Sequence, residues 1–290
     1  MTKKELGKIM KIYLECIPCM LNQALRVSEE IGIKEQDQKI IMQKALLALT
    51  KFDEFDSSPQ ISNSVMASIK DYTDLEDPYS TIKSKDLQAA LNLYPTCKEI
   101  VDNSDDKLKA ALLFAAIGNS LDAAVAINPD IEAMIEDEIS KGFTRNDYDI
   151  LKEKLKTAKT ILYIGDNVGE SVFDTLALEQ LSKNAKCYFA TRDCNVINDV
   201  TVEYAYKSNI DKYASILSSG SHYAGTIVKE CNQEFLELFK SADVIIAKGQ
   251  GNFETLDIES NIFFLLKAKC RLIAKRLDTN IQSYNLVYKK

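Results

Sequence analysis

Residues 160–170 read Thr-Ile-Leu-Tyr-Ile-Gly-Asp-Asn-Val-Gly-Glu, and a helical pattern follows from Ser171 to Leu178. An apolar run that ends in glycine predicts a buried strand, and the polar residues after it predict a tight turn and a helix start. In open α/β sheets, ligands bind at the carboxyl ends of strands, where the helix start adds free N–H groups and a positive dipole end. This stretch therefore predicts a ligand site on an α/β sheet.

The turn supplies oxygen ligands. Asp166, Asn167 and Glu170 carry the hard oxygen donors that suit Mg²⁺ or Mn²⁺ better than zinc. The same residues also suit a simple helix start, in which Asp166 or Asn167 caps the helix and Glu170 complements its dipole. Taken alone, these residues leave both interpretations open.

Short apolar runs alternate with helical patterns from Leu151 onward. The expected strands cover Thr160–Ile164, Lys186–Thr191, Ala214–Ser218, Val244–Ala247 and Arg271–Ala274, with Asn285–Tyr288 as a sixth. The expected helices between them cover Ser171–Ser182, Val200–Tyr206, Thr226–Lys240 and Asn261–Lys269. This alternation predicts a doubly wound, Rossmann-like α/β fold with a parallel sheet. Residues 1–150 show amphipathic helical patterns without a strand signal, so we expect an N-terminal all-helical domain there and an α/β domain over 151–290.

Polar loops, several of which contain glycine, follow the expected strands. One ends in Asn198-Asp199, and another reads Lys-Gly-Gln-Gly-Asn over 248–252. Because a parallel sheet brings such loops to one edge, Asp166, Asn167, Asp199 and Lys248 should converge. Two carboxylates and an amide oxygen can hold one divalent cation and leave positions open for water and substrate.

The loop at 248–252 suits a phosphate group. Lys248 would contact a phosphate oxygen, and the N–H groups of Gly249 and Gly251 would form an anion-binding concavity. The competing interpretations are a solvent-exposed turn for this loop and a helix cap for Asp199, which would then precede a helix at Val200. We favour the binding role for the loop because an apolar strand delivers it to the edge that carries the acids.

Two further motifs remain open between a site role and a structural one. Asn119 and Asp122 lie three residues apart after Gly118 and would share a helical face, where they would contribute to the site. Alternatively, Gly118 ends one helix and the polar residues begin the next. Cys16 and Cys19 form a Cys-x-x-Cys pair that suits a metal or redox role, or two buried thiols at a helix start.

Composition excludes several classes of protein. The 290 residues carry 43 acidic and 36 basic side chains, for a net charge of −7. The sequence has no long basic block of the kind that binds nucleic acid. The most apolar window, Leu108–Ile127, contains charged residues that argue against a membrane span, and the N-terminus has no signal-peptide core. Seven scattered cysteines fit reduced thiols, so we expect a cytoplasmic protein. The single histidine, His222, excludes histidine-rich zinc sites.

Taken together, four motifs in order resemble the metal-dependent damage-control phosphatases, formerly a domain-of-unknown-function family. The motifs are Asp166–Glu170 with Phe173-Asp174, Asn198–Thr201, Ala242–Glu254 and Phe264–Cys270. The Cys-x-x-Cys pair and the Gly118–Asp122 segment are similar to the stand-alone prokaryotic branch. Two segments depart from the family pattern, namely Arg192–Asn195, which replaces a small Gly-Pro turn, and Leu277–Asn280.

The resemblance implies hydrolysis of phosphorylated small metabolites with a divalent metal, which would be Mg, Mn, Co or Ni. It implies that Asp166, Asn167 and Asp199 bind the metal and that Lys248 contacts the phosphate. We add Gly249, Gly251, Asn252, Asn119 and Asp122 as expected substrate phosphate contacts. Sugar phosphates, nucleotides and phosphopantetheine-like compounds are the candidate substrates.

Our mechanistic hypothesis is an in-line attack on phosphorus by water or by Asp166 itself. Glu170 or Asp174 would handle protons or orient the metal shell, and a nearby cation would relieve the repulsion between these two acids, which lie four residues apart. Two other functions fit the same fold: a methyltransferase or another nucleotide-cofactor enzyme, and a non-catalytic metal-binding interaction module. The sequence does not determine the oligomeric state.

Overall fold

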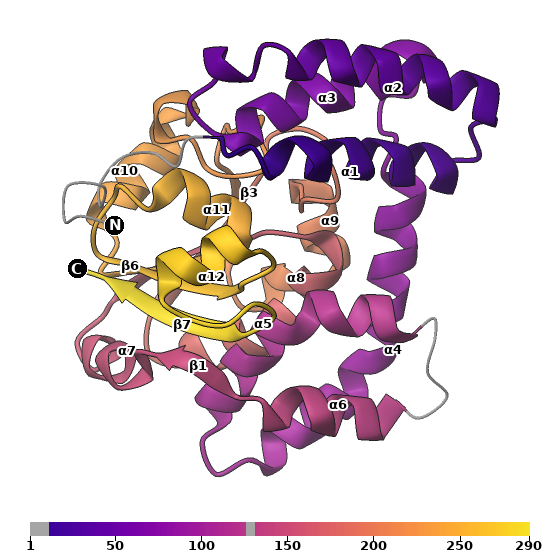
Figure 1. Ribbon diagram of the computed structural model, residues 1–290. Helices are drawn as coiled ribbons and strands as arrows, with labels where there is room; N and C mark the ends of the chain where they lie inside the picture. The colour runs from indigo at the N-terminus through magenta and orange to yellow at the C-terminus, as the bar shows by residue number, and fades with distance from the viewer. Residues whose placement is uncertain (1–11, 126–130) are drawn as a thin grey trace.

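A computed structural model describes residues 12–125 and 131–290, without the side chains of residues 119–132. Within these ranges the chain forms a seven-stranded sheet with helices on both faces (Figure 1). In chain order, the strands are β1 (Phe143–Asn146), β2 (Thr160–Ile164), β3 (Lys186–Thr191), β4 (Ser215–Ser218), β5 (Val244–Lys248), β6 (Ile262–Lys267) and β7 (Tyr284–Lys289).

The helices precede the sheet and then alternate with its strands. They are α1 (Cys16–Glu30), α2 (Glu35–Leu49), α3 (Ser58–Thr73), α4 (Ser80–Asn103), α5 (Lys107–Val125), α6 (Ile131–Ser140), α7 (Tyr148–Leu155), α8 (Val168–Leu181), α9 (Val202–Lys207), α10 (Gln233–Ser241), α11 (Gly249–Leu256) and α12 (Arg271–Leu277). Short 3₁₀ turns lie at Phe52–Glu54, Ile210–Lys212 and Val228–Glu230. None of the helices in the described ranges is long and apolar enough to cross a membrane.

The strand order is β1-β7-β6-β5-β2-β3-β4. From β2 the chain proceeds outward to β3 and β4, returns to β5 on the other side of β2, and continues to β6. The order therefore reverses between β2 and β5, which lie side by side in parallel. At such a reversal the loops after the two strands diverge to opposite faces of the sheet and leave a crevice for ligands.

This architecture confirms the predicted α/β fold class, with one correction to the sheet. The five strands from β6 to β4 are mutually parallel, but β7 pairs antiparallel with β6, and β1 pairs parallel with β7. The strand β1 also lies within the range that we expected to be entirely helical. It was missed because its four residues alternate between half-buried and exposed positions and provide little apolar signal.

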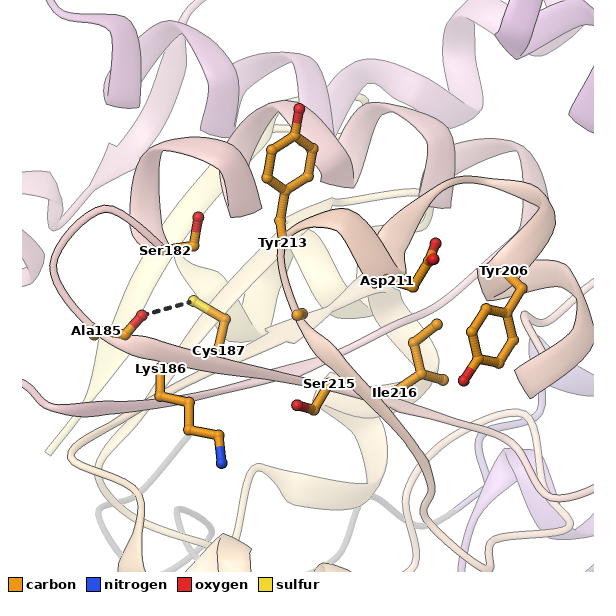
Figure 2. A pocket seen from close by; sticks show the side chains of 10 residues that line it. Ser182, Ala185, Lys186, Cys187, Tyr206, Asp211, Tyr213, Ser215 and Ile216 are labelled. Carbon is orange, nitrogen blue, oxygen red and sulfur yellow. Dashed lines mark hydrogen bonds between the residues drawn. The ribbon is translucent and has the colours of Figure 1, made fainter.

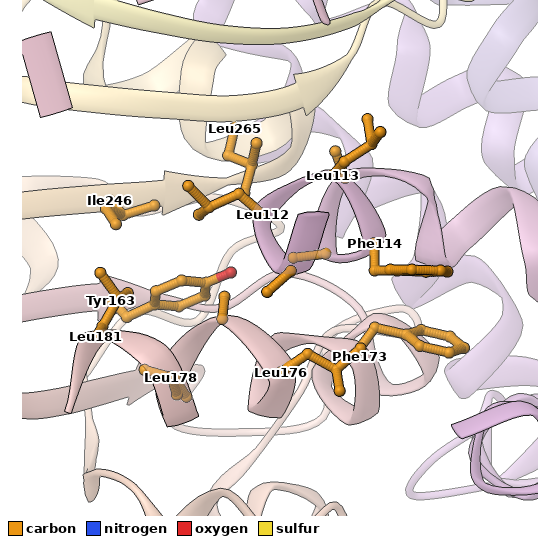
Figure 3. Packing of buried hydrophobic residues seen from close by; sticks show 14 of the residues in the cluster. Leu112, Leu113, Phe114, Tyr163, Phe173, Leu176, Leu178, Leu181, Ile246 and Leu265 are labelled. Atoms are coloured by element: carbon orange, nitrogen blue, oxygen red, sulfur yellow. The ribbon is translucent and has the colours of Figure 1, made fainter. Parts of the chain in front are cut away.

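Each central strand is buried on both faces, which fixes the three-layer arrangement. Ile161 and Tyr163 of β2 belong to a core shared with α4, α5 and α8, whereas Leu162 and Ile164 belong to a second core shared with α10, α11 and α12. Figure 3 shows part of the first core, where Leu112 of α5 faces strand residues and α8 packs alongside. A third core joins α1, α2 and α3.

The predicted helix over Asn261–Lys269 is wrong, because this segment contains strand β6. The predicted strand over Arg271–Ala274 is also wrong, because these residues begin helix α12. Residues 262–266 of β6 are all buried. A strand covered on both faces is continuously apolar and has no period of two, so its periodicity does not separate it from a buried helix.

Candidate active site

Asp166, Asn167 and Asp199 meet at the carboxyl ends of β2 and β3. The segments that carry them pair with each other, since the Val200 N–H donates to the Asp166 carbonyl over 2.7 Å and Asn167 forms an antiparallel bridge with Asp199. Their exposed fractions are 7%, 7% and 1%. The structure thus brings together three residues that the sequence predicted would converge.

Gly249 places the first turn of α11 directly beneath the Asp166 carboxylate. Its φ is +78°, a value that favours glycine, and an added Cβ would lie only 1.8 Å from Asp166 Oδ2. Gly251 is also tightly enclosed, because its Cβ would lie 2.1 Å from the Ala224 carbonyl oxygen. The two glycines therefore allow α11 to approach both Asp166 and the loop after β4.

Lys248 is buried, and it faces two carboxylates. Its Nζ donates to Glu170 Oε2 over 2.9 Å and to Asp174 Oδ1 over 2.8 Å. Burial opposes the ammonium charge, but Asp174 and Glu170 outweigh burial and raise the pKa of Lys248. Lys248 is thus the cation that relieves the repulsion between the two acids, and these bonds use two of its three donor hydrogens.

The two acids beside Lys248 differ in their surroundings. Glu170 Oε1 accepts a hydrogen bond from Asn167 Nδ2 over 3.0 Å. Burial alone would raise the pKa of Glu170, but the charge of Lys248 outweighs burial and lowers this pKa. Asp174 is fully buried and accepts from the Tyr163 hydroxyl over 2.7 Å. Burial raises the pKa of Asp174 to about 6 even though Lys248 opposes that shift. Asp174 Oδ2 has no hydrogen-bond partner among the described residues.

Arg192 is part of the site, although the residues predicted from the sequence did not include it. Its segment was noted only for its departure from the family pattern. The Arg192 guanidinium is 1% exposed and donates through Nε to Asp199 Oδ2 over 2.7 Å. It also donates to Thr226 Oγ1 over 2.9 Å and to Asn252 Oδ1 over 3.0 Å. The available signal was its position directly after a buried strand at the edge that carries the acids.

Asn252 ties this network to the sheet. Its Nδ2 donates to the Gly165 carbonyl over 3.1 Å and to the Lys248 carbonyl over 2.7 Å, while Oδ1 accepts from Arg192 and from Thr226. Both donor hydrogens and both lone pairs of the amide are thus in use. A phosphate contact from Asn252, which we expected, would require one of these bonds to break.

The electrostatics of the site favour a cation. Burial, then the charges of Glu170 and Asp199, raise the pKa of Asp166 well above its ordinary value. Burial also raises the pKa of Asp199 although Arg192 opposes it. Within the described part of the chain, no group donates a hydrogen bond to the Asp166 carboxylate.

The donors fit a hard divalent ion that retains part of its water shell. No cluster of three or more His, Cys, Asp and Glu side chains in the described ranges is arranged to hold a metal. Two carboxylates with the amide oxygen of Asn167 are a sparser set, and Mg²⁺ commonly binds one or two carboxylates and keeps several waters.

The predicted contacts from Asn119 and Asp122 lie outside the described side chains. Helix α5 runs without interruption from Lys107 to Val125, so the predicted alternative of a helix break at Gly118 is wrong. An added Cβ on Gly118 would lie 2.8 Å from Phe173 and 3.3 Å from the Glu170 Cα. This glycine therefore lets α5 approach α8 beside the site, although glycine is unfavourable within a helix.

Cys16 and Cys19 begin helix α1 in the N-terminal helical part. Cys16 is half-buried and Cys19 is exposed, so the interpretation as two buried thiols is wrong for Cys19. Burial raises the pKa of the Cys16 thiol to about 11, which keeps it protonated at neutral pH. This thiol is therefore a weak nucleophile.

Two hollows differ in their relation to this site. One of about 560 Å³ lies at the amino ends of β3 and β4, where Lys186 and Ser215 begin the strands (Figure 2), so it is at the wrong edge of the sheet for this chemistry. Another of about 250 Å³ lies between α3 and the loop that leads to Asp199, and its lining includes Met66, Lys70 and Val196. The smaller hollow is at the carboxyl edge.

The family model of the damage-control phosphatase ARMT1-like domain matches residues 12–283. The chain belongs to this family. Damage-control phosphatase PH1575 of Pyrococcus horikoshii is 37% identical over 281 residues, which cover 92% of this chain and 94% of that protein. A damage-control phosphatase of Archaeoglobus fulgidus is 31% identical over 284 residues, covering 94% of this chain and 97% of that protein.

The fold comparison agrees with the family assignment. The crystal structure of the DUF89 family protein PH1575 from Pyrococcus horikoshii matches this damage-control phosphatase with a TM-score of 0.89 and 33% sequence identity. The match covers 97% of this chain and 100% of that chain. These findings confirm the predicted family, fold class and phosphatase activity.

Proposed function

We propose that this phosphatase hydrolyses phosphate monoesters of small metabolites at the carboxyl ends of β2, β3 and β5. In this proposal Asp166, Asn167 and Asp199 hold one divalent cation, which would be Mg, Mn, Co or Ni. The substrate phosphate would lie between that cation and the start of α11. Sugar phosphates, nucleotides and phosphopantetheine-like compounds remain the candidate substrates.

The charge balance of the buried network carries this proposal. Four carboxylates belong to it, on Asp166, Glu170, Asp174 and Asp199, but the buried cations bonded to them are only Lys248 and Arg192 among the described residues. If all four acids were ionised, two negative charges would lack a buried counter-charge, which agrees with the raised pKa values of Asp166 and Asp199. Because unpaired buried charges are costly, one divalent cation would balance the network.

The residues of the chain would divide the remaining work. When bound, the cation supplies Lewis acidity that draws charge from the phosphate and lowers the pKa of water. The remaining donor of Lys248 and the free N–H groups of Gly249 and Gly251 would bind phosphate oxygens. Glu170, which Lys248 keeps charged and which is 5% exposed, would accept a proton from the attacking water.

Asp174 has a different role in this proposal from the proton transfer that the sequence suggested. Its side chain is 0% exposed and contacts Lys248 and Tyr163. It would therefore orient Lys248 rather than touch the substrate. The sequence-based proposal that Asn119 and Asp122 contact the substrate phosphate is kept.

The organic part of the substrate would bind in the hollow of about 250 Å³ between α3 and the loop before Asp199. Most of this hollow is lined by apolar groups such as Met66 and Val196, with Lys70 and His222 among the polar ones. Its volume is below the range of about 300–1,000 Å³ that is typical for drug-sized ligands, which favours small metabolites. We further propose that the protein acts in the cytoplasm.

Phosphate release from p-nitrophenyl phosphate tests the metal site. Asp166→Asn and Asp199→Asn should each abolish turnover that depends on Mg²⁺, Mn²⁺, Co²⁺ or Ni²⁺. Asp193→Asn is a matched control, because Asp193 lies on the same loop but is 46% exposed and contacts His222. Undiminished turnover in both site variants would refute the ligand assignment.

A panel of phosphorylated sugars, nucleotides and phosphopantetheine compounds would then identify the substrate class. Family membership favours this hydrolysis over the methyltransferase alternative and over a non-catalytic module. Metal binding without turnover of any ester in the panel would favour the non-catalytic module instead.

A further inference from the structure

The loop that carries Asp199 contains a strained turn. Ile197 has a φ of +37°, and positive values are rare for β-branched residues. The Asp199 N–H closes this turn by donating to the Val196 carbonyl over 3.0 Å. A backbone in such a conformation persists only when its surroundings hold it in place.

A fully buried lysine from the N-terminal helices holds this loop. Lys83 of α4 is 0% exposed, and its Nζ donates to Asn195 Oδ1 over 2.9 Å and to Asp77 Oδ2 over 3.0 Å. The same Nζ lies 5.5 Å from the ring centre of Tyr204, at the other end of the segment that carries Asp199. Lys83 therefore contacts the chain on both sides of Asp199.

Other contacts from the helical part reinforce this attachment. Lys70 Nζ donates to the Asn195 carbonyl over 3.4 Å, and the Ile197 side chain packs against the core of α1, α2 and α3. Burial lowers the pKa of Lys83, while the charge of Asp77 opposes that effect. The ion pair with Asp77 thus stabilises a charged group in a position where an unpaired lysine would be costly.

We propose that Lys83, through its hydrogen bond to Asn195, is a positioning residue that holds the Asp199 carboxylate in the geometry needed to bind the divalent cation. The inference rests on the proposed metal site. Without the Lys83 contact the strained turn at Ile197 would relax, and Asp199 would turn away from Asp166. The N-terminal helices would then contribute to metal affinity without contacting the metal.

Binding of Mn²⁺ to the full chain without substrate tests this inference, with free Mn²⁺ measured by electron paramagnetic resonance. Asn195→Ala removes the lysine contact and leaves the pair of Lys83 with Asp77 intact. We expect it to weaken Mn²⁺ binding by about tenfold, because residues that orient metal ligands typically contribute 10–100-fold to affinity. Asn195→Asp retains an acceptor for Lys83 and should recover most of the affinity, which a general loss of packing would not explain.

Two further variants complete the test. Lys83→Met should weaken Mn²⁺ binding at least as much as Asn195→Ala. Ser58→Ala is the control, because Ser58 donates to Glu254 and so joins α3 to α11 rather than to the Asp199 loop. Its Mn²⁺ affinity should match the wild type. Thermal unfolding of each variant establishes that binding is measured on folded protein, and if Lys83→Met does not fold, Asn195→Ala and Asn195→Asp still decide the question.

The outcomes separate this inference from the proposed function. If the wild type binds Mn²⁺ and Asn195→Ala binds it equally well, the positioning role of Lys83 is overturned and the metal site stands. Equal weakening in Asn195→Ala and Asn195→Asp would also overturn it. If the wild type neither binds Mn²⁺ nor releases phosphate from any ester with any of the four metals, the proposed function itself fails.

Discussion

Replacing Gly249 by alanine tests the contact between α11 and Asp166. The new Cβ would lie 1.8 Å from Asp166 Oδ2 and 2.2 Å from its Cγ, whereas real Cβ contacts are at least about 3.0 Å. The carboxylate would therefore have to move by about 1 Å. A misplacement of about 1 Å in a catalytic site can lower the rate by about 100-fold, and we expect a loss of that order in kcat.

The backbone adds a separate effect on stability. Alanine at a φ of +78° costs about 1–2 kcal/mol relative to glycine. Gly32→Ala is the matched control, because Gly32 has a φ of +76° and a Cβ added there would have no neighbouring atom within 4 Å. In urea, both variants should lose a similar amount of unfolding free energy because of the backbone. Gly249→Ala should lose more than Gly32→Ala if the Asp166 side chain is strained.

Steady-state hydrolysis of p-nitrophenyl phosphate, measured with saturating metal, gives the kinetic result. Gly32→Ala should keep the wild-type kcat, and only Gly249→Ala should lose activity. Equal kcat values for Gly249→Ala and the wild type would show that the position of the Asp166 carboxylate above Gly249 does not matter for catalysis, and the reasoning would fail.

Three other predictions concern the buried network. Tyr163→Phe removes the hydroxyl that donates to Asp174 over 2.7 Å and leaves a buried acceptor short of one partner. The free energy of unfolding in urea should therefore fall by about 1–3 kcal/mol. An unchanged urea midpoint would contradict this prediction. The pKa of Asp174 is about 6 in the folded protein, against an ordinary value of 3.8. Between these two values the folded state binds more protons than the unfolded state. This group therefore lowers the free energy of unfolding by up to about 3 kcal/mol as the pH rises from about 4 to 6. Urea unfolding at several pH values should therefore show a flatter pH dependence for Asp174→Asn than for the wild type, and parallel curves would count against it. Mn²⁺ at 100 times its dissociation constant should stabilise the wild type by about 2.7 kcal/mol, seen as a higher melting temperature, and should not stabilise Asp199→Asn; an equal shift in both proteins would exclude Asp199 as a ligand.

Local sequence was sufficient to predict strands wherever burial follows a simple local pattern. The strands at 160–164 and 186–191 were predicted with the bounds that the structure has, because an apolar run ends at a clear turn signal. The convergence of Asp166 and Asp199 followed from a general property of parallel sheets, which brings the carboxyl ends of neighbouring strands together. The sequence by itself therefore determined the fold class and most of the acidic residues of the candidate site.

Tertiary structure decided what depends on partners far away in the sequence. Strand β6 lies between β5 and β7 and is buried on both faces, so its residues have no alternating pattern that would distinguish it from a helix. The bonds of Lys248 with Asp174 and of Arg192 with Asn252 join residues 74 and 60 positions apart. No local pattern encodes such pairs, because a buried charged side chain meets its partners only after the sheet has assembled.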